Sequence, residues 1–303
     1  MLSPVDLPGC VAWYDFSTPN NVFKDAYRLQ AVTANNDLVG SATDLSGQGN
    51  HLTLPLNSTA QGSWKSATGT INFGIPNYLM APDSPSLSLL QGTIFAVCQT
   101  TQTNVGRYIV AKMPSGAATI EYGFKTAVSE TAMTLEVKNG TDGTATTAGS
   151  PAGNDGNNHI WMGTFSSGAL SVWMDNAQNA TSTTAAVFDG TGDLVVGGDH
   201  GSAGYTGAGI GEVIIYNRVM KASQRAQINT YLADKWNVTL GTPTTRTIRN
   251  SVDGKYDTYH LDGSLWGNTD GGVPHNKVST VTGTKHGTQD SHRDTDRATA
   301  EAR

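Results

Sequence analysis

The pattern of apolar and polar positions changes its period between residues 212 and 236. Val213, Ile214 and Ile215 follow one another within residues 212–217. An uninterrupted apolar run of this kind is typical of a strand that is covered on both faces. We therefore predict a central strand here, with the rest of the domain packed around it.

Beyond Ser223 the apolar residues recur at helical spacing, at Ile228, Tyr231, Leu232 and Trp236. This spacing predicts an amphipathic helix over residues 223–236, with one apolar stripe that lies on the domain. Ser223 is the expected N-cap, because its hydroxyl can accept a hydrogen bond from an unpaired backbone N–H. The other faces are expected to stay exposed, and they carry Gln224, Arg225, Gln227, Asn229, Asp234 and Lys235.

Short apolar runs separated by turn residues fill most of the chain before residue 212. Their number and spacing predict a sandwich of β-strands. In residues 120–125 and 133–138, apolar and polar residues alternate, so we expect both strands to expose one face to solvent. The run at residues 10–16 is expected to pair with the central strand. The predicted strands are residues 10–16, 70–73, 93–99, 120–125, 133–138, 159–165, 170–175 and 194–197.

Residues 159–175 predict a hairpin that turns at residues 166–169. Pairing Phe165 with Leu170 places Trp173 and Asp175 on the face opposite the core. A tryptophan flanked by Ser and Asp could stack on a sugar, so Trp173 and Asp175 are candidate ligand-binding residues. The alternative, which we favour, is that a loop or the C-terminal segment covers Trp173.

The glycine-rich segment at residues 197–209 precedes a strand. A glycine-rich loop holds phosphate where it opens a helix, so this segment does not predict a nucleotide site. Asp199, His200 and Tyr205 could face a ligand at the rim of the sandwich and are further candidates for ligand binding. The alternative is that they are simply solvated in the loop.

The segment DLSGQGNH at residues 44–51 has the composition of a tight turn. Its two glycines permit a positive φ, and the side chains of Asp44 and Asn50 can hold nearby backbone groups. This structural role is sufficient to account for the segment.

Three segments together resemble one family. They are CVAWYDF at residues 10–16, DLSGQGNH at residues 44–51, and EVIIYNR followed by a helix that ends YLADKW, within residues 209–236. They are similar to segments of the laminin-G-like (concanavalin A-like) jelly-roll superfamily. The resemblance spans roughly residues 5–238. It implies an all-β, two-sheet antiparallel jelly-roll sandwich with one C-terminal amphipathic helix. Because some laminin-G-like domains bind calcium, Asp44 is a candidate Ca²⁺ ligand, and no other cofactor is implied.

Residues 241–303 differ in character from the rest of the chain. They are polar, with scattered aromatic residues and no sustained period, so we divide the chain into a jelly-roll domain at residues 1–240 and an extended polar C-terminal arm at residues 241–303. The arm has too little apolar surface to fold alone. We expect it to become ordered on a neighbouring subunit or a virion shell, or else to wrap its own sandwich. Its candidate partner-binding residues are Tyr256, Tyr259, Leu261 and Trp266.

Charge and cysteine content narrow the range of partners. The 19 Lys and Arg residues against 25 Asp and Glu give a net charge of −6, without a basic stripe before residue 240, so nucleic acid is not an expected partner. No apolar run approaches the ~18 residues of a membrane span, and the N-terminal residues have no export signal, so neither a membrane nor secretion is expected. Cys10 and Cys98 lie in apolar runs and are expected to be buried thiols, with a disulfide as the alternative.

The sequence does not suggest an active site. Glycoside hydrolysis needs two carboxyl groups about 5 to 10 Å apart, whereas Glu121, Glu136 and Glu212 are each isolated in their strands. We therefore predict that the protein is not an enzyme.

Domains similar to this one are frequent in tailed-phage virion proteins. The resemblance thus implies a structural or adhesive virion component.

Such a component would be a capsid decoration or tail protein that assembles in the host cytoplasm and is exposed on the particle. It would contact other virion proteins, further copies of itself, or a cell-surface glycan. The alternatives are a secreted carbohydrate-binding protein and a glycoside hydrolase.

Overall fold

The computed structural model of this chain describes two units separately. The described residues are 2–56, 58, 61–74, 77–101, 108–114, 120–126, 133–138, 153, 155–182, 187, 189–198 and 208–241, and five short strands between residues 245 and 286. The first unit consists of residues 1–220 and 224–241, and the second of residues 221–223 and 242–303.

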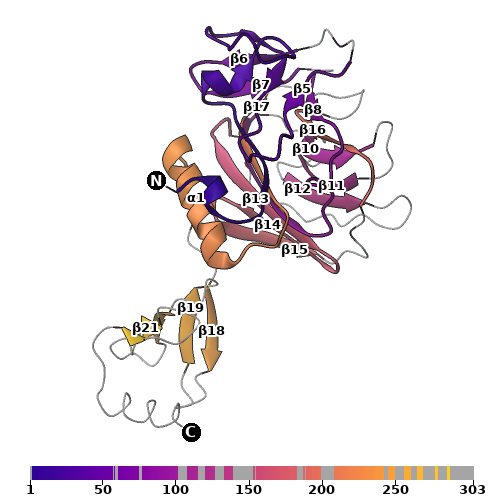
Figure 1. Ribbon diagram of the computed structural model, residues 1–303. Helices are drawn as coiled ribbons and strands as arrows, with labels where there is room; N and C mark the ends of the chain where they lie inside the picture. Colours follow the sequence, from indigo (N-terminus) through magenta and orange to yellow (C-terminus); the bar gives the residue numbers. More distant parts are fainter. Residues whose placement is uncertain are drawn as a thin grey trace. The chain divides into compact units, whose positions relative to one another are not determined.

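Two antiparallel sheets and one helix build the first unit (Figure 1). This confirms the predicted jelly-roll sandwich. The nine-stranded sheet runs in the order β15 (Ala177–Ser182), β14 (Ala169–Met174), β13 (His159–Ser166), β9 (Gly92–Thr100), β17 (Ala208–Tyr216), β7 (Thr70–Asn72), β6 (Gly62–Lys65) and β3 (Leu38–Val39), with β1 (Cys10–Asp15) also paired to β17. The eight-stranded sheet runs in the order β12 (Met133–Lys138), β11 (Ile120–Thr126), β10 (Tyr108–Met113), β16 (Asp193–Val196), β8 (Leu79–Ala81), β5 (Leu52–Thr53), β4 (Ser41–Ala42) and β2 (Val22–Phe23). The helix is α1 (Ala222–Trp236), and two single turns of 3₁₀-helix are η1 (Pro4–Asp6) and η2 (Pro19–Asn21).

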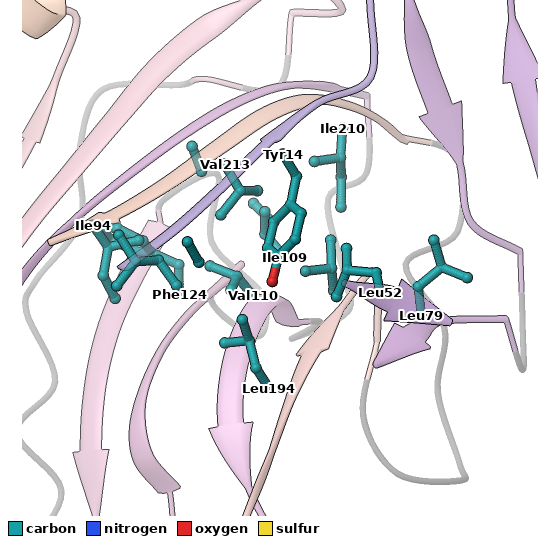
Figure 2. Close-up of a cluster of buried hydrophobic side chains, with 14 of the residues drawn as sticks. Tyr14, Leu52, Leu79, Ile94, Ile109, Val110, Phe124, Leu194, Ile210 and Val213 are labelled. Atoms are coloured by element: carbon teal, nitrogen blue, oxygen red, sulfur yellow. The ribbon is translucent and has the colours of Figure 1, made fainter. Parts of the chain in front are cut away.

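The main hydrophobic core fills the space between the two sheets. Figure 2 shows Ile94 and Val213 of the nine-stranded sheet opposite Phe124, Val110 and Leu194 of the eight-stranded sheet. All five side chains are fully buried. Alternating residues of both sheets meet in this layer, as the period of two along the strands predicts.

The strand β17 occupies the centre of the nine-stranded sheet, as predicted. It pairs with β9 on one side and with β1 and β7 on the other, and the β1 register matches Trp13 with Ile214. A β-bulge lies between Ile210 and Glu212. The extra residue lets Ile210 and Val213 both point into the main core, while Ile214 points to the opposite face.

The helix α1 covers the outer face of the nine-stranded sheet. Its residues Ile228, Leu232 and Trp236 are buried in a second hydrophobic cluster. The sheet contributes Phe95, Val97, Ile160, Met162, Trp173, Ile214 and Tyr216 to this cluster. The predicted amphipathic helix is therefore confirmed, and it explains why β17 is apolar on both faces.

Two details of the helix differ from the prediction. Helix α1 begins at Ala222, so Ser223 lies inside its first turn and does not precede it as an N-cap. Asn229 is fully buried and donates to the side chain of Asn176 at 3.1 Å. Arg225 and Lys235 are also partly buried. The face that packs on the sheet is wider than the apolar stripe, because polar side chains with partners extend it.

The prediction of a solvent-exposed face on β11 and β12 is wrong. Glu121 and Glu136 are only 1% and 4% exposed. Each carboxylate lies against a lysine of a neighbouring strand, Lys112 or Lys125 respectively. Alternation of polar and apolar residues thus identified two different faces correctly, but ion pairing let the polar face be buried.

Cys10 and Cys98 are both buried thiols, as expected. Cys98 belongs to the core between the sheets, whereas Cys10 belongs to the cluster under α1. The two thiols therefore lie on opposite faces of one sheet, which excludes a disulfide between them.

Parts of the second unit pair as strands. The strands β18 (Thr245–Arg249), β19 (Tyr256–His260) and β20 (Leu265–Asn268) form one antiparallel sheet, and β21 (Lys277–Val278) and β22 (Lys285–His286) form a hairpin. These strands were not predicted, because this polar sequence has no sustained hydrophobic period. The expectation that the arm becomes ordered on a partner stays a prediction.

Candidate functional site

Two of the three segments that carry the family resemblance, residues 10–16 and 209–236, meet at one buried carboxylate, that of Glu212 in β17. It accepts hydrogen bonds from the indole N–H of Trp13 at 2.7 Å, the hydroxyl of Tyr231 at 2.8 Å, the Nζ of Lys235 at 2.8 Å and the indole N–H of Trp236 at 2.8 Å. The carboxylate thus joins β1, β17 and α1. We call Glu212 and its four donors the Glu212 cluster.

Electrostatics within this cluster favour a fixed structural role. Burial raises the pKa of Glu212, and attraction to Lys235 partly offsets this rise. Lys235 also contacts Asp15 at 2.8 Å. Burial would raise the pKa of Asp15 as well, but Lys235 and the hydroxyls of Ser17 and Thr18 hold it below its usual value. One lysine therefore bridges two carboxylates.

The turn at residues 44–51 is held by Asp44, as predicted. One carboxylate oxygen accepts the backbone N–H groups of Trp13 at 3.0 Å and Ser46 at 2.9 Å. The other accepts the N–H of Asn50 at 2.9 Å and the hydroxyl of Ser46 at 2.8 Å. Because donors of the chain itself occupy both oxygens, this geometry disfavours Asp44 as a cation ligand. The calcium suggestion stays an untested expectation.

Asn50 and His51 complete this turn. The amide of Asn50 donates to the carbonyl of Val11 at 2.8 Å, which ties the turn to β1. The Nδ1 of His51 accepts the backbone N–H of Asp44 at 3.1 Å. Burial and the positive charge of Arg28 lower the pKa of His51, so the neutral imidazole is favoured.

A second group of charges lies in the eight-stranded sheet. The Nζ of Lys112 contacts Glu121 at 2.6 Å and Asp83 at 2.9 Å. On the neighbouring strand, Lys125 contacts Glu136 at 2.8 Å. The structure therefore does bring two carboxylates, those of Asp83 and Glu121, into one site, although strand parity did not suggest it. A lysine lies between them.

A third charged group lies at one end of β13. His159 bridges two carboxylates, with Nδ1 at 2.6 Å from Asp175 and Nε2 at 3.1 Å from Asp155. The hydrogen bond to Asp175 raises the pKa of His159, against the effect of burial. Asp175 also accepts the N–H of Ile160 at 2.8 Å, so this candidate ligand-binding residue is used inside the fold.

The interpretation of Trp173 as a sugar-stacking platform is wrong. Trp173 is only 7% exposed, because α1 lies over that face of the sheet. The guanidinium carbon of Arg225 lies 4.8 Å from the centre of its ring. The favoured alternative, that Trp173 is covered, is correct in outcome, but the helix provides the cover instead of a loop or the C-terminal segment.

The other candidate residues lie either outside the described residues or in strands of the second unit. Asp199, His200, Tyr205 and Leu261 lie outside the described residues. Tyr256 and Tyr259 belong to β19, and Trp266 belongs to β20. Their proposed contacts with a partner stay predictions.

Sequence reasoning missed a hollow beside α1. It has a volume of about 400 Å³ and is lined by apolar Leu2, Ala226 and Tyr231 and polar Gln227, Thr230 and Asp234. An aromatic ring beside amide, hydroxyl and carboxylate groups has the chemistry of a small-molecule site. The spacing of Gln227, Thr230 and Asp234 along one helical face is the signal that could have pointed to it.

The described part of the chain contains neither a metal site nor a membrane-spanning helix. No cluster of three or more His, Cys, Asp and Glu side chains there is placed to hold a metal ion. Within the same residues, no helix has the length and apolar character needed to cross a membrane.

Comparison with solved structures shows which folds this chain is similar to. The binding domain of Paraclostridial Mosquitocidal Protein 1 has a TM-score of 0.51 and 11% identity, over 91% of this chain and 71% of that chain. The binding domain of botulinum neurotoxin serotype D has a TM-score of 0.53 and 8% identity, over 83% of this chain and 62% of that chain. At such low identity these similarities show the fold alone.

An enzyme also shares this fold. Trypanosoma rangeli sialidase in complex with sialic acid has a TM-score of 0.51 and 13% identity, over 76% of this chain. The match covers only 34% of the sialidase chain.

Sequence comparison then assigns the family. No curated protein has a significantly similar sequence. The model of one superfamily, however, matches residues 73–224, which is half of the chain. Together with the jelly roll and the converging motif segments, this match shows that the chain belongs to the concanavalin A-like lectin/glucanases superfamily.

Proposed function

We propose that this protein is a non-catalytic adhesive component of a phage virion, a capsid decoration or tail protein that uses its lectin-type jelly roll to hold a surface glycan. Its partners would be other virion proteins, further copies of itself, and the glycan. The placement on a virion is supported by the resemblance of the three motif segments to domains of tailed-phage virion proteins.

One observation carries the non-catalytic part of the proposal: the buried carboxylates of the described sheets are used by the fold itself. Glu212 accepts four hydrogen bonds, and Glu121 and Glu136 each pair with a lysine. A glycosidase needs one carboxyl group that donates a proton and a second that faces the sugar. Glu121 and Glu212 are each 1% exposed, so a glycosidic bond has no access to them.

The alternatives differ in chemistry and in location. The glycosidase alternative has the shared site of Asp83 and Glu121 in its favour, but the ammonium of Lys112 separates the two carboxylates. The secreted carbohydrate-binding alternative shares the glycan with our proposal and differs only in where the protein acts.

The hollow beside α1 is the glycan contact that we propose. Tyr231 offers a ring, and Thr230 and Asp234 offer polar groups around it. A Thr230→Trp substitution would fill the hollow from an exposed helical position. Ser223→Trp is the matched control, because Ser223 is exposed on the same helix and does not line the hollow.

Two measurements test the proposal. Gold-labelled antibodies against the protein should decorate particles in negative-stain images of the native assembly, whereas label only on free protein would contradict the virion placement. On a glycan array, Thr230→Trp should abolish binding and Ser223→Trp should retain it. Equal binding by both variants would exclude the hollow beside α1 as the site.

A further inference from the structure

The ammonium group of Lys112 is held inside the protein by three acceptors. Its Nζ lies 2.6 Å from Oε2 of Glu121, 2.9 Å from Oδ1 of Asp83 and 3.3 Å from the carbonyl oxygen of Gly190. Lys112 belongs to β10, Glu121 belongs to the adjacent β11, and Asp83 follows β8. We call these three side chains the Lys112 triad.

Burial differs within the triad in a way that matters for its chemistry. The side chain of Lys112 is 0% exposed, that of Glu121 is 1% exposed, and that of Asp83 is 32% exposed. A buried ion pair has lost the hydration of both charges. Transfer of one proton from the Lys112 ammonium to the Asp83 carboxylate would remove the charges of Lys112 and Asp83 and leave a neutral amine beside a carboxylic acid. The carboxylate of Glu121 would keep its charge, and its hydrogen bonds to Nζ and to the N–H of Gly192 would stabilise it.

We propose that the Lys112 triad forms an intramolecular amide bond between Nζ of Lys112 and Cγ of Asp83. After the proton transfer, the lone pair of Nζ attacks Cγ, and the nitrogen–carbon bond forms. The carboxylate of Glu121 takes one proton from Nζ and passes it to the departing hydroxyl of Asp83. The carbon–oxygen bond breaks, one water molecule leaves, and Glu121 ends in the state in which it began.

The geometry places both reacting groups around Nζ. The reaction requires Nζ to come within about 3 to 3.5 Å of Cγ of Asp83, and in the structure Nζ is 2.9 Å from Oδ1, one bond away from that carbon. A general base should lie within hydrogen-bond reach of the proton that it removes, and Glu121 is 2.6 Å from Nζ. The partial exposure of Asp83 gives the released water a way out.

Two glycines hold the base in position. Oε1 of Glu121 accepts the N–H of Gly192 at 2.9 Å, which leaves Oε2 for Lys112. A Cβ atom at Gly190 or Gly192 would come within 2.7 or 2.8 Å of Oε1. Glycine at these positions therefore allows the backbone to close over Glu121 and keep solvent away from it.

The bond would connect parts of the sheet that are not neighbours. The order of strands is β10, β16, β8, so the amide would tie the end of β8 to β10 across the intervening β16. A covalent tie of this kind restricts the unfolded chain in the way that a disulfide does. Such a tie would strengthen the jelly roll against force, which suits the adhesive role proposed above.

Intact mass spectrometry of the purified full chain tests the proposal directly. We expect the folded protein to weigh one water molecule less than its sequence. After denaturation and trypsin digestion, residues 66–107 should be joined to residues 108–125, because an acylated Lys112 is no longer a cleavage site. The neighbouring ion pair of Lys125 and Glu136 is the internal control, and Lys125 should be cleaved normally.

Three variants distinguish the proposed amide bond from other causes of a mass deficit. Glu121→Gln and Lys112→Arg should both retain the full sequence mass. Asp83→Asn should still react, but with loss of ammonia in place of water. Circular dichroism confirms that each variant is folded.

The wild-type protein alone can overturn the proposal. A wild-type chain of full sequence mass, with a tryptic cut after Lys112, would show that the triad is only an ion cluster. A mass deficit of one water that maps to a cyclised Asp–Gly peptide, such as Asp189–Gly190, would also overturn it.

Discussion

Replacing Glu212 with glutamine is expected to destabilise the jelly roll without changing the volume of the side chain. The carboxylate accepts hydrogen bonds from Trp13, Tyr231, Lys235 and Trp236. The glutamine carbonyl can keep about half of these donors, but the glutamine NH₂ group would face the others and leave them without an acceptor. Each unsatisfied buried donor costs about 1 to 3 kcal/mol. With the weakened attraction to Lys235, we expect a loss of about 3 to 5 kcal/mol, as for other broken buried charge pairs.

Thermal unfolding followed by circular dichroism measures this loss. For a domain of this size, each kcal/mol lowers Tm by about 2 to 4 °C, so Glu212→Gln should lower Tm by about 6 to 20 °C. Asp234→Asn is the matched control, since Asp234 is an exposed acid on α1, the helix that carries Tyr231, Lys235 and Trp236, and its effect should stay within about 0.5 kcal/mol. A Glu212→Gln protein that melts like the wild type would refute the structural role of the Glu212 cluster.

Three further substitutions and one chemical probe test other parts of the structure. Trp236→Ala should lower the free energy of unfolding by about 3 to 5 kcal/mol. Gly211→Ala should lower it by about 1 to 3 kcal/mol, because the new Cβ would lie 2.4 Å from the Trp236 ring. Urea unfolding measures both losses, and a variant as stable as the wild type would contradict the prediction made for it. Because the pKa of His159 is raised in the folded protein, the protonated imidazole contributes its full stability below the ordinary pKa of 6.5, and this contribution is lost as pH rises through the higher folded value. The stability difference between wild type and His159→Gln should therefore shrink as pH rises above about 6.5. A constant difference would show that the imidazolium does not contribute. Both thiols are buried, and burial raises the pKa of Cys10 to about 12. Neither Cys10 nor Cys98 should therefore react with a thiol reagent at pH 8 until the protein unfolds, and rapid labelling of the native protein would be inconsistent with their burial.

The fold was predictable where one period repeats along the chain. The run of Val213, Ile214 and Ile215 identified β17 as central, because only a strand covered on both faces is apolar throughout. The pairing of Phe165 with Leu170 was also predictable, since a short hairpin turn sets the register. In both places local sequence determines the structure.

Contacts between distant residues were not predictable in the same way. Parity along β14 gives the face on which Trp173 lies, but it does not say that α1 covers that face. The Glu212 cluster joins residues far apart in the sequence, and each acid looked isolated within its own strand. The alternation of side chains along a strand cannot reveal such partners, because it describes one strand at a time.

The side chains of β10 illustrate the same limit. Lys112 and Asp83 lie in different segments, and neither carries a local signal of a charged site. The ion pairs of the eight-stranded sheet emerge only once β8, β16, β10 and β11 are placed side by side. This is why the sequence predicted an exposed polar face there.

The central claim, that the carboxylates of this jelly roll serve the fold and not glycoside hydrolysis, is tested most directly by an assay of hydrolysis. The purified full chain would be incubated with β-glucans, bacterial polysaccharides and sialylated glycans, and released reducing ends and sialic acid would be measured. We expect no release above the buffer blank, even from glycans that the protein binds. Release by the wild type that disappears in Glu121→Gln, Glu136→Gln or Glu212→Gln would contradict the claim.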